Sequence, residues 1–163
     1  MATYVTEGIE KNIERSTTVD APVETVWALV SDLTNMGRWS PQCRWTHVFG
    51  GETKQGATAL NINHRGWLHW PTQSKVVRYD ENSEIAFRIK ENQTTWYYRL
   101  TPAGPDGTAT TLTAGREAEK GTLKLSSVLV DKVLGGQEDF TAELKQGLEQ
   151  TLARIKAEAE QQA

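Results

Sequence analysis

The sequence predicts an α+β domain in which a curved antiparallel sheet of about seven strands is wrapped around a long C-terminal helix. Three observations lead to this fold class. Residues 42–115 alternate between apolar and polar side chains and are interrupted by regularly spaced turns, which is typical of an antiparallel meander. The end of the chain carries an apolar stripe at helical spacing. Two short helical segments follow the first strand.

Composition limits the class of protein. The 163 residues are 37% hydrophobic and 24% charged, which is ordinary for one globular domain. We expect a flexible N-terminal tail over residues 1–9 and a single domain over 10–160. The net charge of −3 argues against nucleic-acid binding. The N-terminus lacks the apolar stretch of a signal peptide, and no run reaches the ~18 apolar residues of a membrane helix. We therefore expect a cytoplasmic protein without stable membrane insertion.

The first elements are a strand and two short helices. Residues 12–19 are rich in β-branched side chains and predict the strand. Pro22 then lies near the start of a helix, where its missing N–H would be unpaired anyway. Apolar residues recur at helical spacing after it, at Val23, Val26, Trp27, Val30 and Leu33. A second helical turn is expected over 34–38, before Ser40-Pro41.

Six further strands follow from the period of two. They are expected near residues 43–49, 59–64, 68–76, 85–90, 96–100 and 108–115. Turn residues separate them, including Gly50-Gly51, Arg65-Gly66 and the segment 102–107. A sheet with one apolar face needs a cover, which the end of the chain provides.

The last third of the sequence returns to helical spacing. Leu125, Leu129 and Val133 lie four residues apart and predict a helix over 122–134, which Gly135-Gly136 ends. A longer stripe then predicts the covering helix, with Phe140, Leu144, Leu148, Leu152 and Ile155 on one side.

An ordered set of short motifs resembles a known superfamily. The set comprises Thr18–Pro22 (TVDAP), Val26-Trp27, Trp39-Ser40-Pro41, Gly66-Trp67, the W-x-T-x-S-x-V-V pattern of 70–77, Phe87, Trp96-x-Tyr98, Gly107-Thr108 and Thr151–Arg154. Together they resemble the polyketide cyclase/dehydrase-like branch of the START-like (SRPBCC) superfamily over residues 11–157. The resemblance implies the helix-grip (Bet v 1-like) fold and an internal cavity for lipids, polyketides or other apolar ligands. It does not imply one activity.

Aromatic side chains are the expected wall of this cavity. We predict that Trp39, Trp70, Phe87, Trp96 and Tyr98 line it, although plain core packing fits the same pattern. The long helix is expected to contribute Leu144, Gly147 and Leu148. A mid-helix glycine is about 1 kcal/mol less favourable than alanine, so Gly147 either leaves room above the sheet or is simply tolerated.

Polar candidates follow from alternation. If Leu60 and Ile62 face the cavity, His64 faces it too, and Thr72, Ser74 and Tyr98 join them by the same argument. An imidazole could bind a ligand hydroxyl or act as a base. The alternative is that His64 is bonded to a neighbouring strand or to water. Arg116 shares the parity of Leu112 and Ala114 and is expected near the cavity mouth.

Neither a metal nor a cofactor is expected. His47, His64 and His69 form the only conceivable trio, but His69 has the opposite parity from Trp70 and no carboxylate accompanies them at ligand spacing. Cys43 is the single cysteine, which excludes an internal disulfide and fits a buried thiol better than a nucleophile.

The favoured function is binding, as carrier or sensor, of a small hydrophobic or amphipathic ligand such as a lipid or polyketide-like molecule. The alternative is a polyketide cyclase/dehydratase-type enzyme, a lyase without metal, that uses His64 and Tyr98. A weaker alternative is a protein-interaction module that uses the outer face of the sheet. The threonine-rich strand near 108–115 favours an amphipathic ligand over a purely apolar one. We expect a monomer or weak homodimer.

Overall fold

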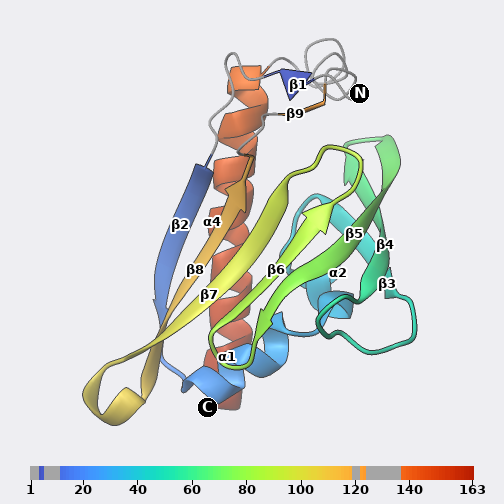
Figure 1. The fold of residues 1–163 in the computed structure, drawn as a ribbon. Helices are drawn as coiled ribbons and strands as arrows, with labels where there is room; N and C mark the ends of the chain where they lie inside the picture. The colour runs from blue at the N-terminus through green and yellow to red at the C-terminus, as the bar shows by residue number, and fades with distance from the viewer. Residues whose placement is uncertain (1–3, 6–11, 119–121, 124–136) are drawn as a thin grey trace.

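The computed structural model of the chain describes residues 4–5, 12–118, 122–123 and 137–163 (Figure 1). Seven antiparallel strands form one sheet in the spatial order β2-β8-β7-β6-β5-β4-β3. The strands are β2 (Asn12–Val19), β3 (Cys43–Val48), β4 (Thr58–Arg65), β5 (Leu68–Asp80), β6 (Glu84–Ile89), β7 (Thr95–Ala103) and β8 (Ala109–Glu117). Strands β3 to β8 follow one another as the predicted meander, and β2 closes the order by pairing with β8.

The helices cover the concave side of this sheet. Helix α1 (Val23–Val30), the short turn η1 (Leu33–Asn35) and helix α2 (Met36–Trp39) follow β2, and a second short turn, η2 (Pro105–Gly107), joins β7 to β8. Helix α4 (Gln137–Gln162) runs along the sheet, and α1 and α2 gather toward its C-terminal end (Figure 1). It contacts β2, β8 and both short helices. The helix-grip fold predicted from the sequence is therefore confirmed.

Two irregularities bend the sheet, and one glycine sets its register. The pairing shifts between Cys43 and Trp45 in β3, and between Val76 and Arg78 in β5. Such bulges bend a strand and increase its twist. Gly66 adopts φ +61° in the turn between β4 and β5, a conformation that favours glycine. This turn pairs Arg65 with Leu68, which fixes the alignment of the whole hairpin.

The solid part of the core lies where α1 meets the sheet and α4. Its fully buried side chains are aliphatic: Val19, Val26, Val30, Ile85, Leu112 and Ile155. Burying one such side chain contributes roughly 1.5–3 kcal/mol. Packing at this end therefore holds α4 against the sheet. The other end can contain a cavity because it is not needed to hold the helix in place.

A short second sheet lies outside the predicted elements. Strand β1 (Tyr4–Val5) pairs antiparallel with β9 (Thr122–Leu123). The helix predicted over 122–134 is therefore wrong at its start, because residues 122–123 are extended and paired with another strand. The rest of that predicted helix lies outside the described residues, as does most of the predicted tail. No helix in the described part of the chain is long and apolar enough to cross a membrane.

Candidate functional site

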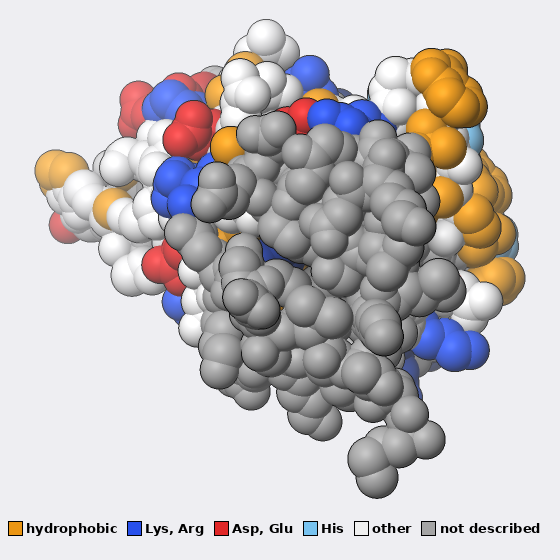
Figure 2. All heavy atoms as spheres, turned by 90° about the horizontal axis from the view of Figure 1, so that it is seen from above, with side chains coloured by type: hydrophobic (Ala, Val, Ile, Leu, Met, Phe, Trp, Pro, Cys, Tyr) orange, Lys and Arg blue, Asp and Glu red, His pale blue; other side chains and the backbone are white. Residues whose placement is uncertain are grey.

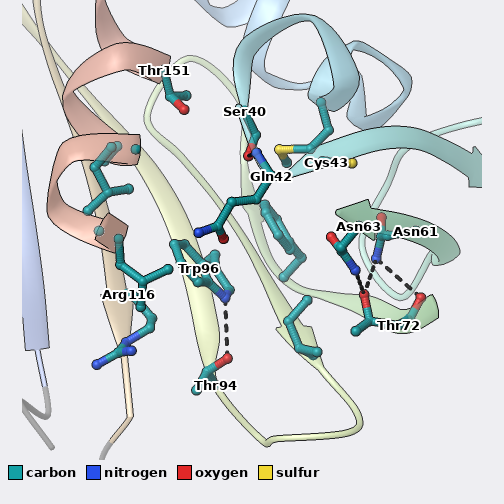
Figure 3. Close-up of a pocket in the computed structure, with 18 of the residues that line it drawn as sticks. Ser40, Gln42, Cys43, Asn61, Asn63, Thr72, Thr94, Trp96, Arg116 and Thr151 are labelled. Atoms are coloured by element: carbon teal, nitrogen blue, oxygen red, sulfur yellow. Dashed lines mark hydrogen bonds between the residues drawn. The ribbon is translucent and has the colours of Figure 1, made fainter. Parts of the chain in front are cut away.

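A cavity of about 180 Å³ lies between the concave face of the sheet and the first half of α4 (Figure 3). Strands β4 to β8 supply one wall, and α4 with the segment after α2 supplies the other. The cavity begins where the aliphatic core ends, so its walls come from the same strands and the same helix.

Aromatic rings make up the floor of the cavity. Phe87 and Trp96 are directly paired between β6 and β7, and Tyr98 follows Trp96 on the same face of β7. The indole N–H of Trp96 donates to Thr94 Oγ1 at 3.2 Å (Figure 3). With its polar atom satisfied, this ring can present an apolar face to a ligand.

Two carboxamides face these rings from β4. Asn63 Nδ2 donates to Thr72 Oγ1 at 2.9 Å, and Asn61 Nδ2 approaches the same hydroxyl at 3.4 Å (Figure 3). Asn61 Oδ1 in turn accepts from the Thr46 hydroxyl at 2.9 Å. These bonds hold the amide planes in fixed orientations. Asn63 Nδ2 donates to Trp70 O at 3.4 Å as well as to Thr72 Oγ1, so its Oδ1 at the cavity wall is the atom that can accept from a ligand hydroxyl.

The segment after α2 adds another carboxamide and a thiol. Gln42 points into the cavity, and its backbone oxygen accepts from the backbone N–H of His64 at 2.7 Å (Figure 3). Burial raises the pKa of the Cys43 thiol above its ordinary value. The thiol is therefore protonated at neutral pH, which fits the predicted inert cysteine better than a nucleophile.

Helix α4 closes the cavity with small and branched side chains. Leu144 and Leu148 lie one turn apart in the wall, and Gly147 lies between them. A Cβ atom at Gly147 would stand 3.6 Å from Pro41 Cγ, so the helix passes close to the segment after α2. The Thr151 hydroxyl donates to the backbone oxygen of Trp39 at 3.3 Å and ties α4 to the end of α2.

Tyr98 and Arg116 add a phenol and a cation to the cavity wall. Burial raises the pKa of Tyr98 well above its ordinary value, and the Cys43 thiol raises it further. Its phenol therefore stays a neutral donor, directed at Met36 Sδ at 3.8 Å. Arg116 is only 5% exposed and lies across the cavity from Asn61 and Asn63 (Figure 3). The parity predicted for Arg116 holds, and it is buried in the wall.

The structure brings most of the predicted site residues together. Those in the cavity wall are Trp70, Thr72, Phe87, Trp96, Tyr98, Leu144, Gly147 and Leu148. Trp39 is instead packed in the solid core, 3% exposed. Ser74 is on the inner face but lies behind the wall, where its hydroxyl accepts from Asn61 Nδ2 at 3.3 Å.

The predicted orientation of β4 is wrong. Leu60, Ile62 and His64 lie on the outer face, because they pair with Gln73, Pro71 and His69 rather than with the inward residues of β5. The cavity residues are Asn61 and Asn63, which were not predicted. The turn at Gly66-Trp67 could have predicted this orientation. A hairpin that pairs Arg65 with Leu68 also pairs Asn63 with Trp70, and Trp70 was predicted to face inward.

His64 therefore has no part in the cavity. Its ring stacks on that of His69 with centroids 5.9 Å apart, and His69 Nδ1 lies 3.0 Å from the backbone oxygen of Trp67. In the described part of the chain, no three His, Cys, Asp or Glu side chains are grouped so that they could hold a metal ion.

Several solved structures have a fold similar to that of this chain. The structure is similar to Zhui aromatase/cyclase from Streptomyces sp. R1128, at 18% identity, with a TM-score of 0.72 and coverage of 93% of this chain and 94% of that one. It is also similar to the Polyketide_cyc-like protein Cgl2372 from Corynebacterium glutamicum, at 26% identity, TM-score 0.61 and coverage of 89% and 88%. A START superfamily protein from Mycobacterium smegmatis matches at 18% identity, TM-score 0.55 and coverage of 85% and 97%.

Sequence comparison gives a more direct assignment. No curated protein matches the chain. The sequence model of one family, described as polyketide cyclase / dehydrase and lipid transport, matches residues 10–160. This match confirms the family resemblance seen in the motifs, and the chain belongs to the polyketide cyclase/dehydrase and lipid transport family.

Proposed function

We propose that the chain binds a small amphipathic molecule in the cavity and acts as a carrier or sensor. The observation that carries the proposal is one cavity in which aromatic rings face a fixed pair of carboxamides. Few precisely placed polar groups among apolar ones are typical of ligand sites. The cytoplasmic location expected from the N-terminal sequence remains a prediction.

The dimensions of the cavity indicate the kind of ligand. An apolar cavity of about 150 Å³ is known to hold benzene, so this cavity encloses a part of the ligand about the size of one ring. Trp96 and Phe87 suit a planar, apolar group, Asn63 Oδ1 suits a ligand hydroxyl, and the Gln42 carboxamide suits a neutral keto or hydroxyl group. A polyketide-like or other oxygenated aromatic molecule combines both properties, and some lipids do as well.

The experiment joins native mass spectrometry of gently purified protein with a thermal-shift screen of aromatic, polyketide-like and lipid compounds. Ligand at 100 times its Kd stabilises the folded state by about 2.7 kcal/mol. Asn63→Leu should weaken binding of a hydroxyl-bearing ligand about tenfold, because the ligand hydroxyl loses its acceptor. Gln73→Leu is the matched control, since Gln73 lies on the outer face of the same hairpin. A protein that retains no molecule and gains no stability from any compound would contradict the proposal.

A second candidate function is cyclisation or dehydration of a polyketide-like chain. It is favoured by the Tyr98 phenol and the buried Arg116 in one wall, a neutral proton donor and a cation that could stabilise an enolate. The aromatase/cyclase from Streptomyces shares the fold. This proposed mechanism does not use His64, which lies on the outer face of the sheet. Turnover of a poly-β-ketone surrogate by the wild type and by Tyr98→Phe tests it, and identical product ratios would remove Tyr98 from the mechanism.

A further inference from the structure

The outer side of strands β3–β5 carries an aromatic surface that the cavity does not use. The outer aromatic face consists of Trp45, His47, Phe49, Leu60, Ile62 and Pro71. Trp45 is 51% exposed and Phe49 53%, while Trp67 in the adjoining turn is 87% exposed. These are the three large hydrophobic side chains that are exposed in the described part of the chain, and they lie in β3, directly after it and in the β4–β5 turn.

The rings on this face form a preformed surface. Trp45 stacks on His47 with centroids 5.9 Å apart, and His47 meets Phe49 edge-on at 5.2 Å. Trp45 is paired across the strands with Ile62, which is paired with Pro71. Contiguous exposed apolar area of this kind marks an interaction site more often than scattered exposed residues do. Strand β4 spans roughly 25 Å, so the surface from Phe49 to Trp67 is long and broad.

The charge of this side differs from that of the rest of the sheet. On β5–β8, several arginines of the outer face are paired with carboxylates, as in Arg78–Glu117 at 2.9 Å and Arg99–Glu84 at 3.1 Å. The outer face of β3, β4 and residues 68–77 of β5 includes no Asp or Glu, whereas Arg44 and Lys75 are exposed at its borders. Figure 2 shows hydrophobic and histidine side chains gathered along one side of the molecule, with basic side chains beside them.

Two nearby carboxylates differ in their partners. Glu143 is paired with the cation Arg65, accepting from its Nε at 2.9 Å, whereas Glu91 accepts from the neutral backbone N–H of Gln73 at 2.8 Å and keeps its charge. Because the exposed Arg44 and Lys75 outnumber Glu91, the outer aromatic face is apolar with a mainly basic border, and it complements a partner that is both apolar and anionic. A second copy of the chain would bring like charges together and fits less well.

We propose that the outer aromatic face docks peripherally on an anionic lipid surface. Indole and phenyl rings favour the boundary between headgroups and acyl chains. Basic side chains near an anionic bilayer add attraction that decays within a Debye length. The face lies on the opposite side of the sheet from the cavity, so this proposal is independent of the ligand that the cavity binds.

Vesicle flotation tests the proposal with the full chain and two lipid compositions, pure phosphatidylcholine and a mixture with phosphatidylglycerol. The wild type should float with the anionic vesicles, and less with the neutral ones. Trp45→Ser/Phe49→Ser/Trp67→Ser should lose binding to both. Trp67→Ser alone changes the most exposed of the three positions, and it should weaken vesicle binding even if the triple variant folds poorly. Arg44→Gln/Lys75→Gln should weaken anionic binding roughly twenty-fivefold, since each basic group is worth about fivefold.

A matched control separates surface charge from net charge. Gln146→Glu/Ala153→Glu places two new negative charges on the exposed side of α4 and changes the net charge by the same amount. This variant should bind anionic vesicles nearly as well as the wild type. Absence of vesicle binding by the wild type, or undiminished binding by both Trp67→Ser and the folded triple variant, would overturn the proposal. So would a concentration-dependent dimer in light scattering that the triple variant abolishes, because the face would then bind a second copy.

Discussion

The two ends of the sheet differ although the same strands and the same helix build both. At the end near α1, the inward positions are aliphatic and fully packed, with Ile85, Leu112 and Ile155 all inaccessible to solvent. Further along the same strands the inward positions carry Phe87, Trp96 and Arg116 and line a cavity. The parity of the strands is the same at both ends. What changes is the shape and polarity of the side chains.

This contrast shows how the cavity is made. Branched aliphatic side chains interdigitate to near-crystalline density. Rigid rings opposite small residues do not, and here Trp96 and Tyr98 face a region that includes Ala114 and Gly147. The polar groups of this end have partners within the protein or face the cavity. The hollow end has less packing energy than the solid end, but it contains a site that can accept a ligand.

The largest expected effect comes from comparing one leucine at each end. Leu112→Ala should lower the free energy of unfolding by about 4 kcal/mol, because it adds a new cavity to a packed region. Leu144 borders an existing cavity, so Leu144→Ala creates little new empty space. It should lower the free energy of unfolding by about 2 kcal/mol, the transfer free energy of the methyl and methylene groups that are removed. Urea unfolding followed by tryptophan fluorescence measures both. Equal losses would mean that the two ends are packed alike.

The sequence was sufficient for the architecture because its signals are local and repeated. The period of two over 42–115 and the stripe from Leu144 to Ile155 each depend on many residues, and all strands of the main sheet were predicted. The inward parity of Trp70, Phe87, Trp96 and Tyr98 followed from the same alternation.

Strand β4 shows where this reasoning fails. Its apolar residues Leu60 and Ile62 lie outside, in the outer aromatic face, while its carboxamides lie inside. The rule that apolar residues face inward gives the wrong side for a strand that supplies the carboxamides of the cavity on one face and part of an apolar surface on the other. Trp39 shows a second limit: its burial in the core depends on how α2 packs against α4, which no local pattern reports.

A pH titration of stability probes the boundary between the two ends, where Tyr98 lies. Burial raises its pKa above the ordinary 10.0. On the outer face, burial and the bond to Glu14 raise the pKa of Tyr97 to about 12. Above pH 10 the unfolded chain therefore loses these protons first, and the free energy of unfolding falls as the pH rises toward 12, by roughly 1 kcal/mol per pH unit for each tyrosine.

Phenylalanine variants assign this slope to each tyrosine. Tyr98→Phe should reduce the slope between pH 10 and 12, and so should Tyr97→Phe, while neither should alter it at neutral pH, where both phenols are protonated in either state. The measurement is urea unfolding at a series of pH values. An unchanged slope for Tyr98→Phe would mean that water in the cavity reaches the phenol. The cavity would then extend further toward α1 than the structure shows.

The smallest effect should come from the glycine on the helical wall. Gly147→Ala adds a methyl group that meets Pro41 Cγ at 3.6 Å, an ordinary contact, so the helix should gain up to about 1 kcal/mol from the better propensity of alanine. The same methyl group occupies space in the cavity wall, so the thermal shift caused by a cavity ligand should shrink while the unliganded protein becomes more stable. Gln146→Ala, on the exposed side of the same helix, should change neither by more than a few tenths of a kcal/mol. Greater stability with undiminished ligand binding would mean that Gly147 is a tolerated glycine rather than a residue that makes room for the ligand.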